Sequence, residues 1–373
     1  MILLAAVVVL LILYALLFVY YWRGWKSIEE FQADGKEKHS FLSVVIPARN
    51  EEKNILNLLN ALAEQTYPKK YFEIIVVDDF STDSTAQIVG SLNLSNLKLV
   101  RPDVAAERSS KKKAIEAGIH HAKGELILTT DADCVPSKNW LAIINGFYVN
   151  GDVVFIAAPV KFTNDKSFLQ RFQSLDFLTL QGITAASVAT NFHTMCNGAN
   201  LAYKREAFFE VNGFEGIDKV ATGDDMLLMY KIWKRYPGKI KYLKSKNAIV
   251  ATEPMRTWEN FFYQRKRWAS KTLVYEDFRI IAVLFLVLLV NCSFIALLIA
   301  SLINPFYWWY VLGFWIAKTI IEIPFVYSVA KFYNEQREVN YFFFFQPLHI
   351  LYTVLTGIFS QFGTYEWKGR KLK

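Results

Sequence analysis

Three long stretches of this chain contain no charged side chain, and they lie near its two ends. They cover residues 1–22, 280–317 and 339–365. About 20 consecutive apolar residues cross a bilayer as a helix, so the pattern predicts one N-terminal transmembrane helix and about three C-terminal ones. We place these helices at 1–22, 279–303, 305–330 and 341–362, the last being either transmembrane or re-entrant.

The first apolar stretch has two possible roles, a cleavable signal peptide or a membrane anchor. No basic region precedes it, no A-x-A-like cleavage site ends it, and it is longer than the apolar region of a signal peptide. These features favour the anchor. Arg23 and Lys26 follow the stretch directly, so the positive-inside rule places the domain between the membrane segments in the cytoplasm.

After a polar linker at 23–40, residues 41–255 alternate between short apolar runs rich in β-branched residues and amphipathic stretches. The runs predict strands at 42–47, 73–79, 97–100, 125–130 and 153–158, and the stretches predict helices at 54–63, 84–92, 111–122 and 168–189. Such alternation predicts an α/β domain whose mostly parallel sheet is covered on both faces.

Acidic residues stand where two of the predicted strands end. Asp78 and Asp79 end the second strand, and Asp131 and Asp133 follow the fourth. Ligands of parallel sheets bind outside the carboxyl ends of the strands. Carboxylates at that edge can hold a hard divalent cation such as Mg²⁺, although aspartate is also a common turn residue that ends a strand without binding a ligand.

The stretch at 256–278 combines aromatic and basic residues next to the second membrane segment. Arg265, Arg267 and Lys271 are among its basic residues, and its position predicts that it lies along the membrane surface. The whole chain carries a formal net charge of +8. Between membrane segments, excess basic residues either face anionic lipid headgroups or cover a solvated surface. Nucleic acid is therefore not an expected partner.

Two features of the membrane part leave alternatives open. Lys318 and Glu322 lie four residues apart inside the third apolar segment. They either form an ion pair that makes the charged span tolerable in the membrane or bind a lipid or substrate. Three C-terminal spans would also place the basic tail at 363–373 outside, against the positive-inside rule. Either one segment is re-entrant or interfacial, or the rule is overridden here.

The cysteine content excludes two classes of protein. The chain has three cysteines, Cys134, Cys196 and Cys292, and none belongs to a C-x-x-C or Cys/His cluster. A disulfide-stapled scaffold and a structural zinc site are both excluded. Reduced cysteines agree with a cytoplasmic domain.

Six sequence blocks, in order and spacing, resemble the family 2 glycosyltransferases. Three are general to that family, and three are similar to its membrane-bound branch, which includes cellulose, hyaluronan and poly-N-acetylglucosamine synthases. The general blocks are SVVIPARNE at 43–51, VVDDFSTD at 76–83 and TDAD at 130–133, and the branch blocks are CNGAN at 196–200, TGDD at 222–225 and QRKRW at 264–268. The resemblance implies a GT-A fold and an inverting transfer from a nucleoside-diphosphate sugar, with uridine the favoured nucleotide.

The resemblance also assigns the nucleotide-binding residues. Asp79 matches the aspartate that reads the nucleotide base, and Pro47, Arg49 and Glu51 occupy the first nucleotide-binding loop. Family members commonly have an aromatic residue where Arg49 stands. Lys111 matches a lysine that contacts the diphosphate, although Ser110 replaces the usual glycine before it, and its alternative is a solvated helix face.

Four further roles follow from the same resemblance. Asp131 and Asp133 match the triplet that binds nucleotide and metal, implying Mg²⁺ or Mn²⁺ as cofactor. Asp225 matches the general base that accepts the proton of the acceptor hydroxyl. Asp224 replaces the usual glutamate beside it, which shortens that neighbouring carboxylate by one methylene and leaves Asp225 in register.

The remaining assigned residues belong to the side of the site that holds the acceptor and the leaving diphosphate. Gln264 belongs to the QRKRW block, and Arg267 would help to stabilise the departing diphosphate. Trp268 packs on the acceptor or holds the interfacial segment. Cys196 is expected to be a packed residue on the acceptor side rather than a nucleophile, because nothing nearby in the sequence would activate it.

The sequence thus predicts a multi-pass plasma-membrane glycosyltransferase with a cytoplasmic catalytic domain and a lipid or lipid-linked acceptor. Four spans are few for a polysaccharide channel, but a processive polysaccharide synthase remains the alternative. A catalytically inactive membrane scaffold is a third hypothesis, and the acidic residues present in every expected block argue against it.

Overall fold

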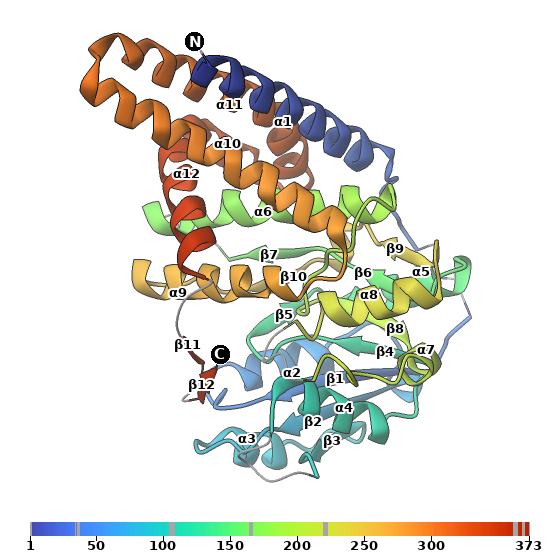
Figure 1. The fold of residues 1–373 in the computed structure, drawn as a ribbon. Helices are drawn as coiled ribbons and strands as arrows, with labels where there is room; N and C mark the ends of the chain where they lie inside the picture. The colour runs from blue at the N-terminus through green and yellow to red at the C-terminus, as the bar shows by residue number, and fades with distance from the viewer. Residues whose placement is uncertain are drawn as a thin grey trace.

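The computed structural model describes residues 2–33, 35, 38–103, 109–163, 167–218, 223–360, 365–367 and 370–372. Figure 1 shows a soluble α/β domain below and a group of long apolar helices above, with two further helices between them. The predicted α/β class and mostly parallel sheet are confirmed, and β8 is the antiparallel strand of the central sheet.

A seven-stranded sheet forms the centre of the soluble domain. Its strands lie in the order β3 (Leu97–Val100), β2 (Phe72–Asp78), β1 (Leu42–Ala48), β4 (Leu126–Thr129), β8 (Leu201–Lys204), β6 (Phe155–Ala157) and β9 (Ile240–Tyr242). The first four are mutually parallel, as the sequence predicts. Strand β8 runs antiparallel to both β4 and β6, because the chain reaches it after the long helix that follows β7.

Helices cover the central strands on both faces, which explains why β1, β2 and β4 are apolar almost without interruption. The covering helices are α2 (Ile55–Ala63), α3 (Thr85–Ser91), α4 (Lys111–His121), α5 (Trp140–Asn150), α7 (Arg205–Glu210) and α8 (Met226–Arg235). A second, three-stranded sheet has the order β5 (Cys134–Pro136), β10 (Val250–Thr252) and β7 (Val160–Phe162).

Two helices separate the soluble domain from the long apolar helices (Figure 1). Helix α6 (Phe168–Ala189) begins with a capping box, in which Ser167 accepts from the backbone of Gln170 and the Gln170 side chain accepts in return. Helix α9 (Trp258–Ala269) is capped by Thr257 and continues as a 3₁₀ turn at Ser270–Val274. Both helices agree with the predicted elements at 168–189 and 256–278.

Within the part of the chain that the structure describes, four helices are long and apolar enough to cross a membrane. They are α1 (Ile2–Ser27), α10 (Phe278–Ile303), α11 (Trp308–Phe332) and α12 (Phe342–Phe359), joined by 3₁₀ turns at Pro305–Tyr307 and Gln336–Tyr341. Helix α1 continues to Ser27, past its predicted end at 22. Its basic residues do not end it, since Trp25 is buried and the Lys26 ammonium lies 4.5 Å above the Trp22 ring.

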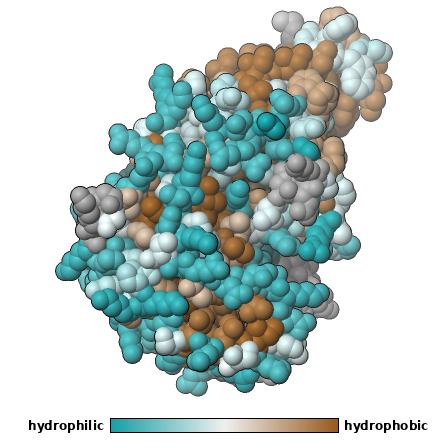
Figure 2. All heavy atoms as spheres, turned by 180° about the vertical axis from the view of Figure 1, so that it is seen from behind, coloured by the Kyte–Doolittle hydropathy of each residue, from teal (hydrophilic) through white to brown (hydrophobic). Residues whose placement is uncertain are grey.

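Apolar side chains gather on the surface at the helical end of the molecule, while the soluble domain is mainly hydrophilic (Figure 2). The exposed apolar residues of this end include Val9, Ile12 and Leu16 on α1, Phe285 and Leu302 on α10, and Trp309 on α11. Exposed apolar surface of this extent is typical of contact with lipid.

Helix α12 packs against both α6 and α9, whereas α1 and α11 pack against α6. Its Phe345 ring contacts the rings of Phe168 and Phe172 on α6, at centroid distances of 5.2 and 5.5 Å. Farther along, Tyr352 packs against Phe261 of α9. Helix α12 therefore lies against the two separating helices over much of its length.

The charged pair inside α11 is buried. Lys318 is fully buried, and its ammonium donates to Glu322 one turn later and to Gln346 of α12, the latter at 2.8 Å. Tyr14 of α1 also donates to Glu322. The two charges thus hold three helices together, which confirms the ion pair predicted from their spacing.

Candidate active site

The loops that follow β1, β2 and β4 meet at one edge of the central sheet. Parallel pairing aligns Ala48 with Asp78, and Val45 with Thr129, so the three strands end side by side. The residues directly after them are Arg49, Asp79 and the Asp131–Asp133 loop. The structure therefore brings together the acidic residues that the sequence placed at strand ends.

Asp79 is held in a fixed position in the first part of the site. Its side chain is buried and accepts a hydrogen bond from the Ser109 hydroxyl. Its own carbonyl accepts from the Arg49 guanidinium at 2.7 Å. Arg49 thus braces the loop that carries Asp79, a role that an aromatic residue in its place would not supply.

The other predicted residues of this loop have structural contacts as well. Pro47 lies within β1, and Glu51 accepts from the side-chain amide of Asn54 at 2.8 Å. The Glu51 backbone N–H donates to the hydroxyl of Thr85 at the start of α3. The first nucleotide-binding loop predicted from the sequence is therefore tied to both neighbouring helices.

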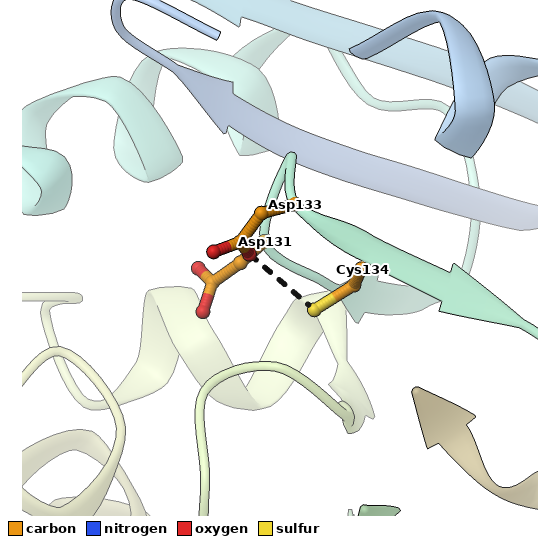
Figure 3. A group of neighbouring side chains, drawn as sticks. All are labelled: Asp131, Asp133 and Cys134. Atoms are coloured by element: carbon orange, nitrogen blue, oxygen red, sulfur yellow. Dashed lines mark hydrogen bonds between the residues drawn. The ribbon is translucent and has the colours of Figure 1, made fainter. Parts of the chain in front are cut away.

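Asp131, Asp133 and Cys134 form the cluster shown in Figure 3, with one donor atom from each within 4.8 Å of the others. The two carboxylates supply the oxygen ligands that Mg²⁺ and Mn²⁺ prefer. Burial raises the pKa of the Cys134 thiol, which donates weakly to Asp133 at 3.7 Å. The carboxylates fit the predicted divalent cation, whereas a neutral thiol does not suit so hard an ion.

Lys111 joins this cluster to the acidic pair at the start of α8. Its ammonium lies 2.7 Å from the carboxylate of Asp131 and 3.0 Å from that of Asp224. Burial alone would lower its pKa, but the two carboxylates raise it well above the usual range. Lys111 is therefore a fixed cation at the centre of the site, and not on a solvated helix face.

Asp225 caps the N-terminus of α8. One carboxylate oxygen accepts from the backbone N–H of Met226 at 2.8 Å, and the other accepts from the N–H of Gly198 at 3.2 Å. A Cβ atom on Gly198 would lie 3.4 Å from both the Asp224 carboxylate and the Lys111 ammonium. The glycine of the CNGAN block thus lets this loop approach the acidic pair closely.

Lys271 is a site residue that the sequence analysis did not assign. Its ammonium lies 3.6 Å from the Asp225 carboxylate, and the side chain is buried. The Asp224 pKa would be raised by burial, but Lys111 and Lys271 together lower it. The acidic pair therefore lies between two lysines, one on the side of Asp131 and one in the 3₁₀ turn after α9.

A cavity of about 610 Å³ lies between the site and the apolar helices. Asp225, Cys196, Trp268 and Lys271 line one part of it, and most of the remaining wall is apolar, from α1, α6, α10 and α12. Burial raises the pKa of the Cys196 thiol, in agreement with a packed residue rather than a nucleophile. Gln264 and Arg267 are not among the described residues that line the cavity.

A buried charge pair stands in the wall of the same cavity. The Arg265 guanidinium donates to one Asp176 oxygen through two nitrogens, at 2.7 and 3.1 Å, and Tyr352 donates to the other oxygen. The guanidinium also lies 4.2 Å from the Trp268 ring. This group ties α6, α9 and α12 together and fixes the orientation of Trp268.

Little in the amino-acid sequence points to this second group. Asp176 is an isolated acidic residue within the apolar stretch at 168–189, and no spacing rule pairs it with Arg265. The one available signal is that a lone carboxylate on an otherwise apolar helix needs a partner. For Lys271 the available signal is its position, three residues after Trp268 in the interfacial stretch.

Residues 43–211 match a protein-family model described as Glycosyl transferase family 2. Over this range the chain is similar to the family 2 glycosyltransferases. The matched range includes β1, β2 and β4 with their site loops, and it ends before Asp225 and the QRKRW block. Asp225 and the QRKRW block suggest the branch that includes cellulose and hyaluronan synthases. Because they lie beyond the matched range, membership of that branch stays a prediction.

Two curated glycosyltransferases are similar in sequence to parts of this chain. Over 154 residues, the chain is 32% identical to the Glycosyltransferase AglE of Haloferax volcanii, covering 40% of this chain and 50% of the relative. Over 257 residues, it is 27% identical to the Probable glycosyltransferase YdaM of Bacillus subtilis, covering 68% of this chain and 60% of the relative. The matches thus span about half the length of these glycosyltransferases.

A solved structure shares the overall fold. The mannosyltransferase PcManGT of Pyrobaculum calidifontis, in complex with GDP-Man and Mn²⁺, superimposes with a TM-score of 0.59 at 20% identity. The superposition covers 95% of this chain and 97% of the other. The GT-A-like domain, with one N-terminal and three C-terminal apolar helices, agrees with the predicted fold.

Proposed function

We propose that this protein transfers a sugar from a nucleoside-diphosphate sugar to a lipid or lipid-linked acceptor at the membrane. One observation carries the proposal: Asp225 belongs at once to the acidic cluster of the donor site and to the wall of the apolar cavity. Through Asp224 and Lys111 it is connected to Asp131, and on its other side it faces the cavity between the membrane helices.

The donor would bind at the edge of the central sheet. Asp79, buried and held by its neighbours, would read the base, and Lys111 would contact the diphosphate. Asp131 and Asp133 would hold Mg²⁺ or Mn²⁺, which supplies positive charge against the departing diphosphate. The neighbour with the same fold was solved with GDP-Man and Mn²⁺, which supports a donor and cation of this kind.

The acceptor would approach from the cavity. Its hydroxyl oxygen attacks the anomeric carbon from the face opposite the diphosphate, which inverts the configuration, and Asp225 takes the hydroxyl proton. Backbone N–H groups from Gly198 and Met226 hold the carboxylate in one orientation. Trp268 offers its ring as one wall for the acceptor.

The structure also favours a lipid over a growing polysaccharide as the acceptor. The cavity wall includes Ile281, Leu284 and Phe285 of α10, which are also exposed on the lipid-facing surface. A lipid can therefore enter sideways from the bilayer. A processive synthase would instead need the cavity to lead along a hydrophilic path across the membrane.

We also propose that the catalytic domain is cytoplasmic and that α12 lies along the membrane surface. Its contacts with Phe172 of α6 and Phe261 of α9 support this arrangement. An interfacial α12 would leave the basic tail on the catalytic side and satisfy the positive-inside rule. Of that tail, the structure describes residues 365–367 and 370–372.

A donor assay tests the proposal. The full chain, reconstituted in nanodiscs of bacterial lipid, is supplied with labelled UDP-glucose, UDP-N-acetylglucosamine or GDP-mannose. We expect release of the nucleoside diphosphate and label in the organic-solvent extract. Label in a polymer that precipitates in ethanol would indicate a processive synthase, and no release with any donor would indicate a scaffold.

A further inference from the structure

The charged side chains that line the cavity are all matched by opposite charges. Among the described residues, these charged groups are Asp176, Arg265, Asp225, Lys271 and Glu322. The first four form two pairs, at 2.7 and 3.6 Å. Glu322 is paired with the buried Lys318 behind it. The cavity therefore offers no unmatched cation among these residues.

The uncharged polar groups of the wall are mostly hydroxyls whose protons are already used. Thr179 donates to the carbonyl of Leu175, and Thr356 donates to the carbonyl of Tyr352, both at 2.8 Å. Their oxygens still have lone pairs that can accept a hydrogen bond. Such a wall suits apolar chains that carry hydroxyl groups, and its described charged residues offer an anion no unmatched cation.

Desolvation makes burial in this cavity far less favourable for an anionic headgroup than for a neutral one. A phosphate monoester carries about −1.5 to −2 charges at pH 7, and burying an unpaired charge in apolar surroundings is strongly unfavourable. At the end of the cavity it would also meet the Asp225 carboxylate, and the Lys271 ammonium there is already paired with that carboxylate. A neutral headgroup meets neither penalty.

The chemistry of the two nucleophiles leads to the same conclusion. A phosphate oxygen is already anionic near neutral pH, so it can attack without losing a proton. An alcohol needs a base at the moment of attack. A carboxylate fixed at the end of the cavity, as Asp225 is, serves the alcohol and repels the phosphate.

From these observations we propose that the acceptor is a neutral lipid with a free hydroxyl group, such as a diacylglycerol, ceramide or sterol, and not a lipid phosphate. This inference rests on the proposed function and adds the chemical class of its acceptor. The hydroxyl oxygen forms a bond to the anomeric carbon as the bond from that carbon to the diphosphate breaks. Asp225 receives the proton and later returns it to water, and the nucleoside diphosphate leaves with the bonding electrons.

The test compares two sets of acceptors in nanodiscs that contain the full chain and the donor it turns over. The neutral set contains diacylglycerol, ceramide and cholesterol, and the acidic set contains polyprenyl phosphate and phosphatidic acid. We expect at least 10-fold more labelled glycolipid from the neutral set, with a linkage that resists mild acid. Label confined to a polyprenyl-phosphate product, or equal transfer to both sets, overturns the inference while the proposed function stands.

Failure of the proposed function gives a different result. In that case no donor releases its nucleoside diphosphate with either acceptor set, and the inference fails with it. Donor turnover without any labelled lipid overturns both the proposed lipid acceptor and the inference, since the sugar would then have gone to water or to a soluble acceptor.

A pair of leucine variants on α10 tests the cavity itself. Leu284 lines the cavity, whereas Leu302, on the same helix, is 77% exposed and does not line it. Leu284→Trp should lower transfer to the neutral set at least 10-fold and keep nucleotide affinity within 2-fold. Leu302→Trp should match the parent in both assays. Equal transfer by Leu284→Trp and the parent would contradict entry through this cavity, and its retained nucleotide affinity shows that the domain is folded.

Discussion

The ammonium of Lys271 lies 3.6 Å from the carboxylate of Asp225, at the point where the apolar cavity reaches the acidic cluster. Lys111 stands in the matching position on the other side, 3.0 Å from Asp224. Two cations thus hold two adjacent carboxylates, and each cation belongs to a different part of the site. Lys111 faces the donor, and Lys271 faces the acceptor.

Replacement of Lys271 should therefore affect transfer more than donor binding. In Lys271→Met, Asp225 loses its cationic neighbour on the cavity side, and we expect the transfer rate to fall about 10- to 100-fold, in the range of single electrostatic contacts at active sites. Nucleoside-diphosphate affinity should stay within a few-fold. Lys271→Arg keeps the charge and should recover much of the rate. Equal losses in the two variants would show that the role is packing.

Removal of the divalent cation should stop turnover. Asp131 and Asp133 offer carboxylate oxygens that lie close together, and a cation there would stabilise the leaving diphosphate. We expect EDTA to abolish release of the nucleoside diphosphate and Mn²⁺ or Mg²⁺ to restore it. Unchanged turnover under chelation would mean that Lys111 alone neutralises the diphosphate.

Acid should weaken the contact between α1 and α6 through His193. The His193 Nε2 atom lies 2.9 Å from the Tyr21 hydroxyl and 3.0 Å from that of Ser187, and burial lowers the His193 pKa to about 4, although Asp277 opposes the shift. Between pH 6.5 and 4 the unfolded chain binds more protons than the folded one, so stability falls as the pH falls.

The variant His193→Gln keeps a hydrogen-bonding side chain and removes this titration. In detergent, the melting temperature of the parent should fall more steeply than that of the variant between pH 6.5 and 4.5. Parallel melting curves over this range would show that the histidine does not link the two helices in a pH-dependent way.

The membrane arrangement can be tested by labelling single cysteines with a reagent that does not cross the membrane. In a Cys292→Ser background, Ile303→Cys lies at the end of α10 away from the soluble domain, and Gln336→Cys lies in the turn before α12. If α12 is interfacial, Gln336→Cys and a cysteine appended after residue 373 should react from the same side, and Ile303→Cys from the other. If the appended cysteine instead reacts with the reagent from the same side as Ile303→Cys, α12 crosses the membrane.

The soluble fold could be predicted because its signals are local. Continuous apolar runs between amphipathic helices indicate strands buried on both faces, and the aspartates at 78–79 and 131–133 stand directly after such runs. The antiparallel direction of β8 could not be predicted, because strand direction depends on the path of the chain through α6. No local pattern encodes that path.

The donor side of the site could be predicted from local sequence blocks, whereas the acceptor side depends on how distant segments pack. Asp79, Lys111 and Asp131 each belong to a block that the family resemblance identifies. The cavity, in contrast, is lined by segments that are far apart in the sequence, so the roles of Asp176 and Lys271 can be recognised only once these segments pack together. Arg265, the partner of Asp176, lies 89 residues away in the sequence. Asp225, the partner of Lys271, caps α8, whereas Lys271 lies in the 3₁₀ turn after α9.

The most direct test of the account measures nucleotide affinity and initial transfer rate for Asp225→Asn and Asp131→Asn in the same membranes. If Asp225 is the base, Asp225→Asn should bind the nucleoside diphosphate within a few-fold of the parent and lose about 10²- to 10⁴-fold in transfer rate. Asp131→Asn should lose both, because its carboxylate would hold the cation that contacts the phosphates. A loss of affinity in Asp225→Asn as large as that in Asp131→Asn would place Asp225 in the donor site, and near-parental transfer would contradict its role as base.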